Sequence, residues 1–207
     1  MGNYIITIAR GYGSGGRTVG KMLAEELGIH YYDRELMRLA SDESGINEEL
    51  FVKADEKVKQ SLLFKVARKA YNGELIPPDR EDFVSNDNLF NYQAKVIRDL
   101  AKEESCVIIG RCADYILKDY DNVIRLYIHA PLDACVKRLQ DMMSGTAREL
   151  EKKVLETDKR RAAYYKYYTG KNWTDAGNYD LCLNTKNMDF KTCVDIAKAY
   201  LEIRKGI

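Results

Sequence analysis

Short apolar runs alternate along the chain with longer segments in which apolar residues recur at three- and four-residue spacing. The short runs predict buried strands at 4–9, 29–32, 106–109, 123–128 and 179–183, and the first of them is rich in β-branched residues. The longer segments predict helices at 18–27, 34–41, 46–71, 89–104, 132–142, 146–168 and 189–204. Strands separated by helices indicate an α/β protein whose parallel sheet is covered on both faces.

Glycine-rich or polar residues follow most of these strands. They are Gly11 to Gly16, Asp33, Gly110-Arg111 and Asn184-Thr185. Because ligands of parallel sheets bind at the carboxyl ends of the strands, we expect the binding site at this edge. The polar segment from Asn72 to Asn88, which contains Pro77 and Pro78, predicts a long loop.

The stretch YIITIARGYGSGGRT, residues 4–18, runs from a strand through a glycine-rich loop into a helix. Such a loop presents backbone N–H groups at the positive end of a helix, which suits a phosphate. Gly11, Gly13 and Gly16 fit the dinucleotide motif G-x-G-x-x-G. Gly11 and Gly16-Arg17-Thr18 fit the mononucleotide loop G-x-x-x-x-G-K-[ST], with arginine in place of lysine. Both motifs predict nucleotide binding, the first for hydride transfer and the second for phosphoryl transfer.

Size and charge narrow the class of protein further. A chain of 207 residues is typical of one domain with a small insert or lid. The net charge of +1 argues against nucleic acid and membrane surfaces as partners. The five cysteines contain no C-x-x-C pair, and no signal peptide or membrane-length apolar run is present, so we expect a cytoplasmic protein. The oligomeric state stays open.

The arginines favour phosphoryl transfer over hydride transfer. Asp33 supports the dinucleotide interpretation, because an acid after the second strand binds the ribose in that fold. However, arginines gather near the predicted strand ends and loops, at Arg10, Arg17, Arg34, Arg38, Arg111, Arg160 and Arg161. Phosphoryl transfer relies on fixed cations that neutralise phosphates, whereas hydride transfer needs no such array.

The basic stretch 148–171 supports the same interpretation. Asp158 and Arg161 are three residues apart and share a helix face, with Arg160 beside them. Arginines on a helical lid, at about 146–172, would close over a triphosphate and exclude water. A solvated helix with ordinary ion pairs is the alternative. The tyrosines at 164, 165, 167 and 168 are expected to pack the lid against the body rather than to stack on nucleic acid bases.

The order of these features resembles that of the nucleoside monophosphate kinases. The glycine loop, Tyr31-Tyr32-Asp33, Ile108 to Arg111, the helix at Ala130-Pro131-Leu132 and the late Asp-x-x-Arg helix follow one another as in cytidylate kinases. The chain resembles in particular the cytidylate kinase-like family, whose loop reads close to RxYGSGGR. The resemblance implies a single P-loop kinase domain over 1–207, with an acceptor-binding insert at about 34–88. It also implies a three-layer α/β/α fold with five parallel strands in the order 2-3-1-4-5.

The same resemblance implies MgATP as the phosphoryl donor. A typical cytidylate kinase loop, GPSGSGKGT, covers Arg10 to Thr18 when it is laid from the strand without gaps, and its lysine then falls on Gly16. In a second register Arg17 replaces the lysine, so the lysine is absent in both. The residues implied to hold ATP are Gly11, Gly13, Ser14, Gly15, Gly16, Arg17 and Thr18, with the Thr18 hydroxyl on Mg²⁺.

For the acceptor, the resemblance implies CMP or dCMP bound by Asp33, Arg38, Arg111, Asp158 and Arg161. The D-G-R-D motif of cytidylate kinases becomes Ile109 to Cys112, which keeps Arg111 and loses both acids. Val154 stands where these kinases carry the first lid arginine. The implied catalytic residues are Arg17, Asp158, Arg160 and Arg161.

The sequence therefore predicts a nucleoside monophosphate kinase-like phosphotransferase that moves the ATP γ-phosphoryl group to CMP, dCMP or a related small acceptor. Three alternatives stay open. One is a nucleotide sensor that lost turnover with the lysine, the second is a P-loop kinase of another small metabolite, and the third is an NAD(P)-binding module.

Overall fold

The computed structural model describes residues 2–56 and 73–205, so part of the helix predicted at 46–71 lies outside the described residues. The strands are β1 Ile5–Arg10, β2 His30–Tyr32, β3 Cys106–Ile109, β4 Val123–His129 and β5 Leu181–Asn184. The helices are α1 Gly16–Leu27, α2 Glu35–Ser44, α3 Glu48–Glu56, α4 Asn86–Glu103, α5 Ala113–Ile116, α6 Leu132–Met142, α7 Ala147–Thr169 and α8 Phe190–Lys205, with a 3₁₀ helix, η1, at Ala176–Asn178.

The sheet has five parallel strands in the order β2-β3-β1-β4-β5. Ile5 of β1 pairs with Cys106 of β3 on one side and with Val123 of β4 on the other. This confirms the predicted α/β fold and its strand order. A dinucleotide-binding sheet places strand 2 beside strand 1, whereas β3 lies there in this protein, so the topology argues against the NAD(P)-binding alternative.

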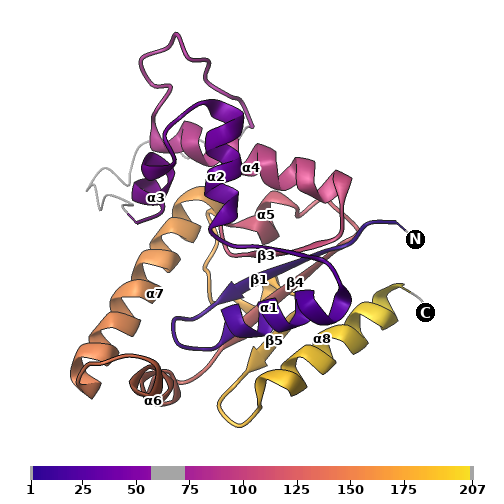
Figure 1. Cartoon of the computed structure of the whole chain (residues 1–207), viewed down its shortest axis with the longest axis vertical. Coiled ribbons are helices and arrows are strands. Elements are labelled where there is room, and N and C mark those ends of the chain that lie inside the picture. The colour runs from indigo at the N-terminus through magenta and orange to yellow at the C-terminus, as the bar shows by residue number, and fades with distance from the viewer. Residues whose placement is uncertain (1, 57–72, 206–207) are drawn as a thin grey trace.

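Helices cover both faces of the sheet (Figure 1). On β1, Ile6 and Ile8 face a core that α1 and α8 complete, while Ile5 and Ala9 face the core under α4 and α5. This alternation is the period of two that a strand imposes on its side chains. Both cores are apolar, which explains why the strands appear in the sequence as nearly continuous hydrophobic runs.

The predicted acceptor insert contains α2, α3 and the loop at 73–85, which pack around α4 at one end of the sheet (Figure 1). The buried Asn88 side chain organises this loop. Its Oδ1 accepts from Ile76 N at 2.8 Å, and its Nδ2 donates to Phe83 O at 2.7 Å. The loop ends earlier than predicted, because the Ser85 hydroxyl accepts from Asn88 N and starts α4 at Asn86.

Helix α7, at Ala147–Thr169, nearly coincides with the lid helix predicted at 146–168. A capping box between Thr146 and Glu149 starts it, and Gly170 ends it in the left-handed conformation. Within the described residues no helix has both the length and the apolarity that a membrane span requires.

Candidate phosphate-binding site

The glycine loop connects β1 to α1 at the carboxyl edge of the sheet. Gly13 and Gly15 have φ angles of 77° and 84°, in the left-handed region that favours glycine. A Cβ atom on Gly15 would also lie 2.2 Å from the ring of Phe190. The sequence therefore needs glycine at this position both for the turn and for the close approach of α8.

The loop leaves backbone donors free at the start of α1. The Gly11 N–H donates to Ile128 O and the Tyr12 N–H to Asp158. Among the described residues, no acceptor serves the N–H groups of Gly13, Gly15, Arg17 and Thr18. Free N–H groups at the positive end of a helix are the donors that a phosphate requires.

Arg138 and Thr185, to which the sequence analysis gave no role, hold the glycine loop through hydrogen bonds to its carbonyl groups. Arg138 of α6 donates from Nη1 to Gly13 O at 3.2 Å, and from Nη2 to Thr185 O. The Thr185 hydroxyl donates to Ser14 O at 2.8 Å. The position of Thr185 after β5 was a usable signal, whereas Arg138 is one of many charged residues on amphipathic helices and no spacing distinguishes it.

Helix α7 contacts the loop through Asp158 and Arg161. Asp158 Oδ1 accepts from Tyr12 N at 2.8 Å, and Arg161 Nη1 donates to the same oxygen at 3.3 Å. Arg161 Nη1 also donates to Arg10 O at 3.0 Å. Burial raises the pKa of Asp158, while the Tyr12 hydrogen bond and the Arg161 charge oppose the rise. The structure thus joins the predicted lid residues to the glycine loop.

Asp33 and Arg111 lie on the β2 and β3 side of the loop. Arg17 Nε pairs with Asp33 Oδ2 at 2.7 Å, and Arg111 Nε donates to Asp33 O at 3.4 Å. Arg111 and Cys112 have φ angles of 57° and 55°, which is uncommon for residues with side chains. Strain of this kind concentrates at functional sites, and here it directs Arg111 toward Asp33.

Arg10 ends β1 in the middle of this arrangement. Its Nε atom is buried and has no hydrogen-bond partner in the described part of the chain, as is also true of Asp33 Oδ1. Burial and the nearby charges of Arg161, Arg17 and Arg111 lower the pKa of Arg10 to about 9, with Asp33 opposing. The sequence counted Arg10 among the arginines but assigned it no role. The usable signal was a cation at the end of an apolar strand, directly before the glycine loop.

Two predicted site residues contact only their own helices within the described chain. Arg38 pairs with Glu35 at 3.0 Å and with Asp42 at 3.3 Å, all on α2. Arg160 donates to the Thr157 hydroxyl at 3.4 Å on α7. Both arginines are exposed, so their roles toward a nucleotide stay predictions.

Comparison with known proteins identifies the family. The sequence model of the cytidylate kinase-like family matches residues 5–187. The chain belongs to this family. The cytidylate kinase of Methanosarcina barkeri is 28% identical over 204 residues, covering 97% of this chain and 98% of that protein. The cytidylate kinase of Methanopyrus kandleri is 24% identical over 207 residues, covering 96% and 93%.

Solved structures agree on the fold. An uncharacterized protein from Eubacterium ventriosum is 27% identical, with a TM-score of 0.70 over 97% of this chain and 99% of that one. The shikimate kinase of Bacteroides thetaiotaomicron has a TM-score of 0.53 over 96% and 98% at 14% identity, which shows the likeness of fold alone.

Two departures of this family member from cytidylate kinase motifs have structural explanations. Val154, at the position of the first lid arginine, is buried in a small core with Cys135, Leu139 and Leu150 that joins α7 to α6. Cys112, in place of an acid, is buried in the main core. Both positions therefore serve packing here.

The tyrosines of α7 also serve packing. The Tyr165 hydroxyl donates to the buried Asp114 at 2.6 Å, and Tyr168 stacks on Phe90 with 3.9 Å between ring centroids. The Tyr167 hydroxyl donates to Asp87 at 3.1 Å. These contacts hold the C-terminal half of α7 against α4 and α5.

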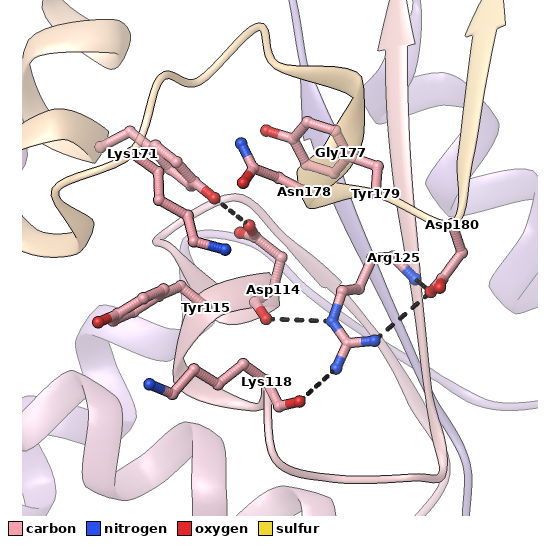
Figure 2. Close-up of a pocket in the computed structure, with 10 residues that line it drawn as sticks. Asp114, Tyr115, Lys118, Arg125, Lys171, Gly177, Asn178, Tyr179 and Asp180 are labelled. Atoms are coloured by element: carbon pink, nitrogen blue, oxygen red, sulfur yellow. Dashed lines mark hydrogen bonds and ion pairs between the residues drawn. The ribbon is translucent and has the colours of Figure 1, made fainter.

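A polar cavity of about 230 Å³ lies between α5, β4, α7 and the segment before β5, and none of the predicted site residues lines it (Figure 2). Arg125 crosses it and donates to the carbonyl groups of Asp114 at 3.3 Å and Lys118 at 3.0 Å. Arg125 Nη1 also lies 3.6 Å from Asp180 Oδ2, which accepts from the Arg125 N–H at 2.7 Å. The guanidinium of Arg125 thus has its hydrogen-bond and ion-pair partners within the protein.

Proposed function

We propose that this protein transfers the γ-phosphoryl group of ATP to a nucleoside monophosphate, CMP or dCMP, or to a closely related small acceptor. The observation that carries the proposal is the combination, at one sheet edge, of free loop N–H groups with a cluster of arginines. Membership of the cytidylate kinase-like family supports it. An oxygen of the acceptor phosphate attacks the γ-phosphorus, the bond to the leaving oxygen breaks, and a nucleoside diphosphate and ADP are released.

On the donor side, the free N–H groups of Gly13, Gly15, Arg17 and Thr18 bind the ATP phosphates. Asp158 keeps the loop in place by accepting from Tyr12 N. Arg161 fixes Asp158 and faces the same edge. These groups neutralise the charge that the phosphates bring, and they are already oriented before the nucleotide arrives. Closure by Arg160 over the transferring group stays part of the proposal.

The residues also fit a magnesium ion. Thr18 is exposed in the first turn of α1, and its hydroxyl has no partner among the described residues. No group of three or more His, Cys, Asp or Glu side chains in the described residues forms a metal site of its own. A hydroxyl beside bound phosphates suits Mg²⁺, which keeps several waters and binds mainly to substrate phosphates. Beside the Thr18 hydroxyl, the ion would supply positive charge that offsets the charge of the phosphates.

On the acceptor side, Arg111 holds the phosphate and Asp33 positions Arg17 and Arg111 through its carboxylate and its carbonyl group. Arg38 would have to leave its pairs with Glu35 and Asp42 to take part. Because Cys112 is buried, recognition of the base falls to residues of the insert.

ADP release, measured with MgATP and each ribo- and deoxyribonucleoside monophosphate in turn, tests the proposal. Turnover highest with CMP or dCMP is the expected result. Absence of turnover with every acceptor overturns it, and calorimetry then separates the alternatives: MgATP binding without turnover indicates a sensor. Turnover with a phosphate-free metabolite such as shikimate, but with no nucleotide, would instead identify a kinase of another small metabolite.

A further inference from the structure

A lysine-containing phosphate loop has a glycine at the position of Arg10 and its lysine at the position of Gly16. In this chain the cation and the glycine have changed places. In the gapless register the first loop glycine falls on Arg10 and the lysine on Gly16. In the structure, α1 begins at Gly16, directly after its N-cap, Gly15, so position 16 lies at the start of the helix. Arg17, the lysine position of the other register, turns instead to Asp33 at the end of β2.

Positions 10 and 16 point into the same space. A Cβ atom on Gly16 would lie 2.4 Å from Arg10 Cβ and 3.1 Å from Arg10 Cγ. A real Cβ atom does not approach another carbon so closely, so a side chain at position 16 and the arginine at position 10 exclude each other. The cation therefore enters this space from the strand end and not from the helix.

The Arg10 guanidinium extends from the loop toward the end of β3. Its Nη1 atom lies 2.2 Å from the place that a Cβ atom on Gly110 would occupy. Gly110 thus leaves room for the guanidinium between the glycine loop and Arg111. In the proposed function the glycine loop holds the donor phosphates and Arg111 the acceptor phosphate, so the guanidinium lies between the two.

Arg10 has no anionic partner of its own. Within residues 2–56 and 73–205 its guanidinium makes no hydrogen bond or ion pair, and its Nε atom is buried. The two acids whose charges act on it both have other partners: Asp33 is paired with Arg17, and Asp158 accepts hydrogen bonds from Tyr12 and Arg161. Three arginines, Arg17, Arg111 and Arg161, also lie close enough to lower its pKa. A partly buried cation without a partner, close to other arginines, costs free energy, and an anion bound in this space would offset that cost.

Building on the proposed function, we propose that Arg10 replaces the lysine of the phosphate loop: its guanidinium contacts the β- and γ-phosphates of ATP and the group in transfer. A loop lysine makes these contacts as a point charge, whereas the fork of an arginine can bind two phosphate oxygens at once. The chain then needs no lysine at position 16 or 17.

Substitutions at positions 10 and 16 test this proposal. Arg10→Met is expected to lower the kcat/KM for ATP about 100-fold, the size of effect seen when one preorganised donor to a transition-state oxyanion is removed. Arg10→Lys is expected to keep more activity than Arg10→Met. The control is Lys137→Met, which removes an exposed cation of α6 that has no ion-pair partner among the described residues; its activity is expected to be unchanged.

The exchange itself gives a sharper test. Gly16→Lys alone is expected to lower Tm, because it places a side chain against Arg10. Arg10→Gly combined with Gly16→Lys removes this conflict and returns a cation, so turnover is expected to recover at least about tenfold over Arg10→Gly. Additive losses in the double variant would overturn the proposal, as would wild-type kinetics of Arg10→Met.

Calorimetry of MgATP binding distinguishes failure of the proposed function from failure of the role proposed for Arg10. If the wild-type protein turns over no acceptor, the proposed function fails. The role of Arg10 is then decided by binding alone: Arg10→Met should weaken MgATP binding at least about tenfold and AMP binding much less. Equal affinities of wild-type protein and Arg10→Met for MgATP would overturn the role of Arg10 whatever the activity.

Discussion

The candidate phosphate-binding site and the polar cavity beside Asp114 each contain a partly buried arginine, Arg10 and Arg125. The two arginines differ in the partners that the protein gives them. Arg125 donates to three carbonyl groups and pairs with Asp180, so every side of its guanidinium has a protein partner. Arg10 has none within the described residues: the two acids whose charges act on it, Asp33 and Asp158, are bound by Arg17 and Arg161. A buried cation that has protein partners stabilises the fold, whereas one without partners can bind an anionic ligand.

The largest expected effect in this comparison is the loss of stability in Arg125→Met. The substitution leaves Asp180 with Arg204 as its ion-pair partner in the described chain and frees the carbonyl groups that Arg125 served. We expect the free energy of unfolding in urea to fall by about 3 kcal/mol. Lys118→Met, at the rim of the same cavity, should change it by less than about 0.5 kcal/mol. A loss in Arg125→Met as small as the one expected for Lys118→Met would show that Arg125 is not structural.

Arg17→Ala is expected to act on catalysis rather than on the fold. Arg17 is half-exposed, with 52% of its side chain accessible, and it pairs with Asp33. We expect the kcat/KM for ATP to fall about 30-fold, or by roughly 2 kcal/mol. Lys21→Ala, one turn further along the exposed face of α1, is the control. If the kinetics of Arg17→Ala match those of the wild-type protein, Arg17 does not belong to the site.

A smaller effect is expected for Arg10→Met on stability. Because the substitution removes an unpaired cation, the free energy of unfolding should stay constant or rise by up to about 1 kcal/mol. Thermal melts in the absence and presence of inorganic phosphate provide the measurement, since phosphate should raise the Tm of the wild-type protein more than that of the variant. A loss as large as that of Arg125→Met would remove the contrast between the two arginines.

The smallest effect concerns pH at the cavity. Burial raises the pKa of Asp114, against the opposing hydrogen bond from Tyr165. The folded state then binds more protons than the unfolded state between the ordinary pKa of an aspartate and the raised one. This stabilising contribution is present at low pH and is lost as pH rises through the raised pKa.

Urea unfolding of the wild-type protein and Asp114→Asn at several pH values tests this sign. The stability of the wild-type protein relative to the variant should increase as the pH falls from neutral toward 4. Asp79→Asn, at an exposed aspartate of the 73–85 loop, should show no such trend. A difference that stays constant with pH would mean that Asp114 titrates alike in both states.

Much of the fold was predictable because its signals are local. Apolar runs located the five strands, and glycine or polar residues after them located the binding edge. Errors occurred where a local contact shifted a boundary or where an element was very short. Ser85 starts α4 three residues before the predicted position, and α5, at Ala113–Ile116, is too short to show helical periodicity.

The sequence by itself determined the glycine loop, the strands and the sheet edge at which they meet, since neighbouring residues set turns, periodicity and helix starts. Only the tertiary structure decided which arginines are paired. Asp158 reaches Tyr12 across 146 residues, and the glycines at 16 and 110 make room for Arg10. Charge pairing and steric exclusion depend on distances between side chains that are remote in sequence. For this reason Arg10 appeared in the sequence as one arginine among many, whereas in the described structure its buried Nε atom has no hydrogen-bond partner.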